Sequence, residues 1–214
     1  AATGNSQFPL ISALGDHDIP WDKVDVFHMD EYLGLDQTAS ASFRRWIRER
    51  IQDRFAPRSV DYIRGDAPDV DAEIARYEAA LRSAPVDVVC MGIGENGHLA
   101  FNEPNACDFN DNRWVAQIEL TPESRRQQVD EGHFADISAV PSSAISLTIP
   151  ALLSAESIIV SAPEARKALA VRDALAGPIS TACPASILRE VPNAVLLLDH
   201  DSSAHLMNGV PADR

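Results

Sequence analysis

The stretch Val86-Asp87-Val88-Val89-Cys90-Met91-Gly92-Ile93-Gly94 is an apolar run that passes directly into two closely spaced glycines. A short apolar run that ends in a turn predicts a buried strand, here over residues 86–93. Alternation of such strands with helical segments is typical of a mostly parallel sheet. We therefore expect an α/β fold with an open, mostly parallel sheet and helices on both faces, a Rossmann-like three-layer arrangement. The other expected strands are residues 24–28, 60–63, 114–118, 144–147, 157–161 and 194–198.

Helical periodicity marks three further segments. Residues 42–54 place large apolar side chains three and four positions apart, which is one helical face. Residues 70–81 follow Asp69, a suitable N-cap, and residues 165–175 precede Gly177-Pro178, a helix stop. No repeat or Gly/Ser-rich linker divides the 214 residues, so we expect one domain over 1–214. Its loop-like start leads us to expect that a native first strand and helix precede residue 1.

The charge balance restricts the kinds of partner. Asp and Glu number 32 against 18 Lys and Arg, a net charge of −14. Such a surface argues against binding to nucleic acid or to an anionic membrane, and no apolar run approaches the ~18 residues of a membrane span. Three widely spaced cysteines fit neither a disulfide framework nor a zinc site. We expect a cytoplasmic protein that binds a small molecule and that could form a homo-oligomer.

Two polar segments follow expected strands, where open parallel sheets bind their ligands. Asp30 and Glu31 end the first strand. One should face the crevice, where burial would raise its pKa and make it a usable base, and the other should be held structurally. A strand-terminating acidic turn is the alternative. The loop from Gly92 to Pro104 carries His98 and Glu103, a carboxylate that can fix the histidine tautomer. A purely structural loop is the alternative there.

A third candidate segment opens the chain. Thr3, Gly4, Asn5 and Ser6 precede an apolar helical pattern and resemble a phosphate cradle, with an ordinary N-cap as the alternative. The pattern lacks the GxxxxGK[ST] signature, so a nucleotide P-loop is not supported. The candidate cations for the same anion are Arg125, Arg126 and Lys167.

These residues carry a family resemblance that covers nearly the whole chain. The sequence resembles the glucosamine-6-phosphate deaminase family, which shares its fold with the 6-phosphogluconolactonases. The motifs that carry the resemblance are FHMDEYLGL (27–35), GIGENGHLAFNEP (92–104), SLTIPALLSA (146–155), residues 166–168 and GPISTACPASIL (177–188). The resemblance implies opening of an amino-sugar 6-phosphate ring, isomerisation through an enediol-type intermediate, and release of ammonia to give fructose 6-phosphate.

The resemblance also implies residue roles. Asp30 would move the proton between C2 and C1, and His98 would assist ring opening with Glu103 orienting it. Residues 3–6 would bind phosphate together with Lys167 and Arg125, and Glu31 and Gly94 are further candidates for contact with the substrate. The chemistry would need no metal and no organic cofactor, because the substrate's own carbonyl accepts the electrons.

Two positions depart from the family pattern. Asn96 stands where familiar deaminases carry an aspartate, so charge support for His98 would come from Glu103 or Glu95. Residues 112–119 lack the basic side chains of allosterically regulated members, so we expect no such regulation. Lactone hydrolysis, action on another sugar phosphate such as galactosamine 6-phosphate, and a non-catalytic sugar-phosphate sensor remain the alternatives.

Overall fold

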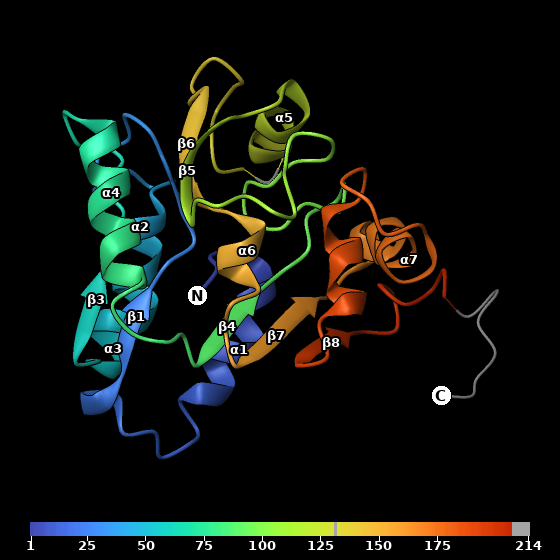
Figure 1. Ribbon diagram of the computed structural model, residues 1–214, viewed down its shortest axis with the longest axis horizontal. Coiled ribbons are helices and arrows are strands. Elements are labelled where there is room, and N and C mark those ends of the chain that lie inside the picture. Colours follow the sequence, from blue (N-terminus) through green and yellow to red (C-terminus); the bar gives the residue numbers. More distant parts are fainter. Residues whose placement is uncertain (131, 207–214) are drawn as a thin grey trace.

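A computed structural model describes residues 1–130 and 132–206 of the chain, in which helices surround three hydrogen-bonded sheets (Figure 1). Two sheets are parallel, in the orders β4-β7-β8 and β1-β3, and the third is antiparallel, in the order β2-β6-β5. The strands are β1 (Asp25–Phe27), β2 (Asp30–Tyr32), β3 (Ser59–Asp61), β4 (Val88–Met91), β5 (Val115–Glu119), β6 (Ser143–Leu147), β7 (Ser157–Ala162) and β8 (Ala194–Leu198).

The expected α/β class, with mostly parallel strand pairs, is confirmed, and every expected strand overlaps an observed one. The antiparallel sheet was not expected. Its strand β2 is only three residues long and begins with two acids, which no hydrophobic pattern marks. Asp30 of β2 pairs with Ser146 of β6, and this pairing sets the position of the first candidate site.

The observed helices agree only in part with those expected from the sequence. The expected helix 70–81 is α4, and Asp69 caps it by accepting a hydrogen bond from Ala72 N at 2.9 Å. The expected helix 42–54 is interrupted by a π-helical turn, so that it reads α2 (Phe43–Ile47), η3 (Arg48–Gln52) and α3 (Asp53–Phe55). The other helices are η1 (Asn5–Gln7), α1 (Phe8–Leu14), η2 (Trp21–Lys23), α5 (Pro122–Asp130), α6 (Ile149–Leu152), η4 (Ala165–Lys167), α7 (Ala168–Ala176) and η5 (Pro184–Glu190).

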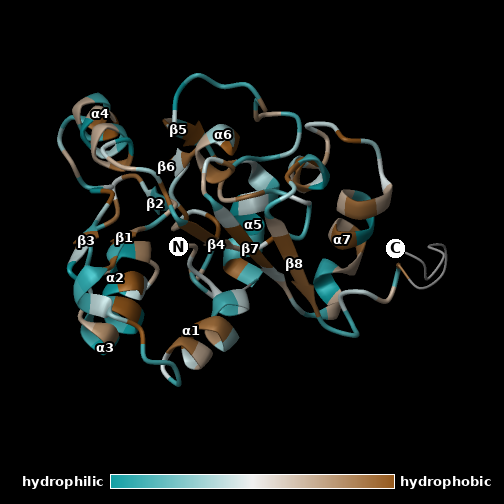
Figure 2. Cartoon of the chain, turned by 60° about the horizontal axis from the view of Figure 1, so that its bottom comes forward, coloured by the Kyte–Doolittle hydropathy of each residue, from teal (hydrophilic) through white to brown (hydrophobic). Residues whose placement is uncertain are grey.

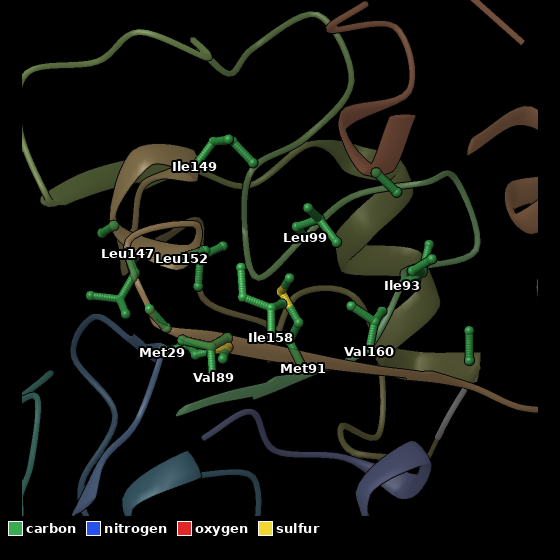
Figure 3. Packing of buried hydrophobic residues seen from close by; sticks show 14 of the residues in the cluster. Met29, Val89, Met91, Ile93, Leu99, Leu147, Ile149, Leu152, Ile158 and Val160 are labelled. Atoms are coloured by element: carbon green, nitrogen blue, oxygen red, sulfur yellow. The ribbon is translucent and has the colours of Figure 1, made fainter. Parts of the chain in front are cut away.

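The main core joins the parallel sheet β4-β7-β8 and the antiparallel sheet to helices α4, α6 and α7. Figure 3 shows Met29, Val89, Leu99, Leu147 and Ile158 among side chains that converge there. Met29 directly precedes Asp30, and Leu99 directly follows His98; their exposures are 1% and 0%. Figure 2 shows β7 and β8 coloured mainly as hydrophobic, whereas the connecting loops are mainly hydrophilic. Both expected site segments are therefore anchored in one core.

The first residues of the chain connect two sheets. The Ala1 amino group donates to Phe27 O at 2.6 Å, and Ala2 N donates to Cys90 O at 2.8 Å. Residues 1 and 2 therefore lie between the ends of β1 and β4, and this position brings the next residues, 3–6, to the carboxyl ends of both strands. Among the described residues, no helix is long and apolar enough to cross a membrane.

A buried polar contact fixes the segment between β1 and β2. The Tyr77 hydroxyl donates to His28 O at 2.7 Å and accepts from His28 N at 2.9 Å. The His28 ring accepts from Ile63 N at 2.8 Å through Nε2. Burial lowers the pKa of His28 to about 3, so the ring is neutral and can act as this acceptor. The segment that leads to Asp30 is therefore hydrogen-bonded to α4.

We expect Tyr77→Phe to lower the free energy of unfolding by about 1–3 kcal/mol, because the buried His28 N–H and C=O would lose their partner. Urea unfolding would measure the change. Tyr62→Phe is the matched control, since Tyr62 is only partly buried and its hydroxyl bonds to the exposed Gln52. Equal unfolding midpoints for the two variants would contradict this account.

Candidate active site

A cavity of about 430 Å³ brings together most of the residues that the sequence singled out. Its walls come from the chain start, β2, the loop after β4, helix α2, helix α5 and η4. The expected residues that line it are Thr3, Gly4, Asn5, Ser6, Asp30, Gly94, His98 and Lys167. Segments more than 160 residues apart in the sequence therefore form one site.

Of the two adjacent acids Asp30 and Glu31, Asp30 is the one that faces the cavity. Its exposure is 8%, and successive residues of a strand point to opposite sides, so Glu31 faces the other way. Burial, and then the charge of Glu31, raise the pKa of Asp30 to about 7, while the Ala1 amino group acts in the opposite direction. A carboxyl group with such a pKa is half ionised near neutrality and is suited to accept a proton there.

Glu31 was expected to contact the substrate, but the structure places it away from the cavity. Glu31 is fully buried and outside the cavity lining. Its carboxylate accepts hydrogen bonds from Ser42 Oγ at 2.8 Å, Phe43 N at 3.2 Å and Arg44 N at 2.9 Å. Burial raises the pKa of Glu31, and these hydrogen bonds oppose the rise. Glu31 therefore holds the start of α2, which forms one wall of the cavity.

His98 lies on the loop after β4, against Gly94. A Cβ atom at Gly94 would lie 2.3 Å from the imidazole ring, so only glycine permits this close approach. Gly94 N also donates to His98 O at 2.9 Å. The ring is therefore seated directly on the backbone of the loop, at the cavity wall.

The buried carboxylate behind His98 belongs to Glu103, whose side chain is 1% exposed. Glu103 Oε1 lies 3.5 Å from His98 Nδ1, and Glu103 Oε2 accepts from Asn96 Nδ2 at 2.8 Å. Asn96 Oδ1 in turn accepts from His98 N at 3.1 Å. The Asn96 side chain thus bonds to both Glu103 and the backbone of His98, and it adds no second negative charge beside the imidazole. Glu95, the other expected support, pairs with Arg166 at 3.1 Å.

The chain start and η4 form the other end of the cavity. Gly4 has a φ of 110°, a conformation that favours glycine, and residues 3–6 curve around this position. Lys167 also lines the cavity and is 7% exposed. Glu164, just before η4, has a φ of 82°, and its N–H is held by Asp199 at 2.8 Å. Backbone strain of this kind is frequent at ligand sites.

Arg125 was expected to bind the anion, but the structure also places it away from the cavity. Its guanidinium donates to Ile137 O at 2.7 Å and to Val140 O at 2.9 Å, and it does not line the cavity. Arg126 is exposed and likewise outside the lining. Both arginines are on α5, a helix that hydrophobic periodicity did not reveal. Arg125 therefore fixes α5 to the loop that follows it.

Several lining residues were not anticipated. Helix α2 and η3 contribute Arg45, Trp46, Glu49 and Arg50, α5 and the turn after it contribute Gln127, Gln128 and His133, and η4 contributes Arg166. A signal for α5 was present in the sequence. Thr121-Pro122 is a cap followed by proline at the first helical position, and Thr121 Oγ1 accepts from Ser124 N at 3.1 Å.

The cavity combines a carboxyl group of near-neutral pKa, an imidazole backed by a buried carboxylate, and a lysine beside a loop rich in hydroxyl groups. This set suits proton transfer on a small polar substrate that has an anionic end. Among the described residues, no cluster of three or more His, Cys, Asp or Glu side chains could hold a metal ion.

Known proteins resemble this chain in sequence and in structure. A family model described as glucosamine-6-phosphate isomerases/6-phosphogluconolactonase matches residues 2–197. The glucosamine-6-phosphate deaminase of Listeria monocytogenes serotype 4a (strain HCC23) is 31% identical over 205 residues, which cover 96% of this chain and 86% of the relative. That of Bacillus thuringiensis (strain Al Hakam) is 32% identical over 201 residues, which cover 94% and 75%.

Two solved structures are also similar. A monomeric glucosamine-6-phosphate deaminase of the NagB superfamily superimposes with a TM-score of 0.84 at 29% identity, over 95% of this chain and 86% of that one. The 6-phosphogluconolactonase of Thermotoga maritima has a TM-score of 0.70 at 20% identity, over 92% and 82%. At that identity the second likeness concerns the fold alone.

Substitution of the neighbouring acids Asp30 and Glu31 should have opposite effects on the free energy of unfolding. Glu31→Gln should lower the free energy of unfolding by about 1–3 kcal/mol, because the amide cannot accept every hydrogen bond that the carboxylate accepts. Asp30→Asn should raise it above pH 7. The folded-state pKa of Asp30 is raised from 3.8 to about 7, so its contribution to stability is lost as the pH rises through that window.

Urea unfolding of both variants at pH 8 and pH 5 would measure these effects. At pH 5, where Asp30 is mostly protonated in the folded state, the gain from Asp30→Asn should shrink. Destabilisation by Asp30→Asn and none by Glu31→Gln would reverse the assignment of the two side chains.

Proposed function

The chain belongs to the family of glucosamine-6-phosphate isomerases and 6-phosphogluconolactonases, and on that premise we propose that it converts glucosamine 6-phosphate and water into fructose 6-phosphate and ammonia. The observation that carries the proposal is Asp30, a buried carboxyl group with a pKa raised to about 7 in the same cavity as His98 and Lys167. The curated relatives named above are glucosamine-6-phosphate deaminases.

In the proposed reaction, His98 acts first. The imidazole takes the proton of the hydroxyl at C1 and passes it to the ring oxygen as the bond between C1 and that oxygen breaks, and the sugar opens to its aldehyde. Glu103, 3.5 Å from Nδ1, would orient the ring and stabilise its positive charge. Asn96 keeps Glu103 in place by donating to its second oxygen.

Asp30 acts second in the proposal. As a carboxylate it removes the proton from C2 of the open sugar and delivers it to C1. The C1 oxygen gains a proton and the amine loses one, so that the aldehyde becomes the C2 imine through an enediol-type intermediate. Water then displaces ammonia from C2 and gives the ketone of fructose 6-phosphate. The pKa of about 7 suits both transfers, because the group can accept and return a proton at neutral pH.

The phosphate end of the substrate would lie among residues 3–6 and Lys167, all of which line the cavity. Hydroxyl groups of Thr3 and Ser6 and the backbone at Gly4 are suited to hydrogen-bond phosphate oxygens, and the lysine supplies positive charge. In this orientation the sugar carbons point toward Asp30 and His98, which line the rest of the same cavity.

The features that favour deamination over lactone hydrolysis are Asp30 and the continuation of the His98 loop. Opening a lactone needs a base that activates water, but it needs no second group to carry a proton between two carbons. Ala100-Phe101-Asn102-Glu103-Pro104 places the carboxylate behind His98, whereas a Ser-Leu-Phe-Pro type continuation is usual in lactonase relatives. Asp30 and His98 both have a role in deamination, whereas lactone hydrolysis would use only one of them.

An assay panel tests the proposal. We expect ammonia and fructose 6-phosphate from glucosamine 6-phosphate, and loss of the product with Asp30→Asn at unchanged fold. The same panel includes galactosamine 6-phosphate and 6-phosphogluconolactone. Faster turnover of either would assign the cavity to that substrate, and binding of sugar phosphates with no turnover by the wild-type chain would indicate a sensor.

The pH dependence should follow Asp30. A base works in its ionised form, so kcat/KM for glucosamine 6-phosphate should fall about tenfold per pH unit below pH 7 and level off above it. Steady-state rates from about pH 5.5 to about pH 9 would measure this profile. A rate that stays constant from pH 7 down to pH 5.5 would contradict the assignment of Asp30 as the base.

A further inference from the structure

Ser124 is a buried hydroxyl on α5 that contacts the carboxylate behind His98. Its exposure is 4%, and its Oγ donates a hydrogen bond to Glu103 Oε1. An ionised carboxylate only accepts hydrogen bonds, so the serine hydroxyl must be the donor. Neither the residue patterns nor the resemblance assigned this serine a role, and it does not line the cavity.

The serine and the histidine share one oxygen atom. Glu103 Oε1 accepts from Ser124 and lies 3.5 Å from His98 Nδ1, whereas Oε2 is held by Asn96 at 2.8 Å. A carboxylate can rotate about its terminal torsion, which is broad and roughly two-fold. Donors on both oxygens restrict that rotation and keep Oε1 directed toward the imidazole.

Helix α5 also contributes to the cavity wall. Gln127 and Gln128 lie three and four positions after Ser124, on the same side of the helix, and both line the cavity. Gln128 Oε1 accepts from the hydroxyl of Tyr32 on β2 at 2.7 Å. One short helix thus contacts the cavity, the strand that carries Asp30, and the carboxylate behind His98.

We infer that Ser124 is a positioning residue for ring opening: it holds Glu103 so that its Oε1 faces His98, and it links the cavity wall of α5 to that pair. This inference rests on the proposed function. It assigns the serine to the ring-opening step alone, because Ser124 bonds to Thr121 and Glu103, whereas Asp30 lies on β2.

The test separates ring opening from proton transfer by using two substrates. Glucosamine 6-phosphate must open before it reacts, and ammonia release reports that route. A 5-deoxy analogue of fructose 6-phosphate lacks the hydroxyl that closes the ring, so it is always open. Exchange of its C1 hydrogen with deuterium from solvent reports the proton transfer at Asp30 alone.

We expect Ser124→Ala to lower kcat/KM for ammonia release roughly 10-fold to 100-fold, the range for a misplaced catalytic group. Exchange on the open analogue should stay within about twofold of wild type. Ser124→Cys, which keeps the volume but donates weakly, should have the same selective effect, and Ser124→Thr, which keeps the hydroxyl, should restore most of the ammonia release.

Ser154→Ala is the matched control, because its hydroxyl bonds to Ala151 O at the end of α6 and it lies outside the cavity lining. An equal loss on both substrates, no loss on either, or a Ser124→Thr variant as defective as Ser124→Ala would overturn the inference. If the wild-type chain releases no ammonia at all, the proposed function fails instead. The wild-type assay thus tests the proposed function, and the variants test the role of Ser124.

Discussion

The pairing of β2 with β6 is the constraint on which the site depends. It places two consecutive carboxylates inside the protein, and the alternation of a strand sends Asp30 to the cavity and Glu31 to the start of α2. Hydrogen bonds from Ser42, Phe43 and Arg44 stabilise Glu31. The charge of Glu31 then adds to burial in raising the pKa of Asp30. The structural carboxylate of Glu31 thus helps to raise the pKa of the carboxyl group that faces the cavity.

The core sets the distance between the segment that carries Asp30 and the segment that carries His98. Met29 before Asp30 and Leu99 after His98 are both packed in the main cluster, although one belongs to the antiparallel side and the other to the loop after β4 (Figure 3). Protein interiors are close-packed, so a shift of either segment would require rearrangement of the cluster. The cavity is therefore shaped by packing that lies beneath it.

Much of the fold could be predicted from the sequence because the strands of the parallel sheet β4-β7-β8 are mainly apolar runs. Strand β8 and helix α4 were predicted with their observed bounds. Strand β2 could not be, because its residues are mostly acidic or polar and are buried through hydrogen bonds that form only in the folded chain. For the same reason the sequence indicated that one of the two acids would be held structurally but did not identify it as Glu31.

For the candidate site, the sequence located residues that lie on a strand end or a glycine loop. Asp30, His98 and Lys167 line one cavity as expected. Arg125 lies outside this cavity, contrary to expectation, because a basic residue has no sequence pattern that distinguishes an anion ligand from a partner of backbone carbonyls. Contributions of α5, such as Gln128, depended on a helix that is polar along most of its length.

The central claim is that Asp30 carries a proton between C2 and C1 of the open sugar. The most direct measurement is proton NMR of fructose 6-phosphate incubated with the enzyme in deuterium oxide without ammonia. The account predicts that one C1 hydrogen is replaced by deuterium with the wild-type chain and that replacement ceases with Asp30→Asn. Unchanged exchange with Asp30→Asn, or no exchange by a wild-type chain that releases ammonia from glucosamine 6-phosphate, would contradict it.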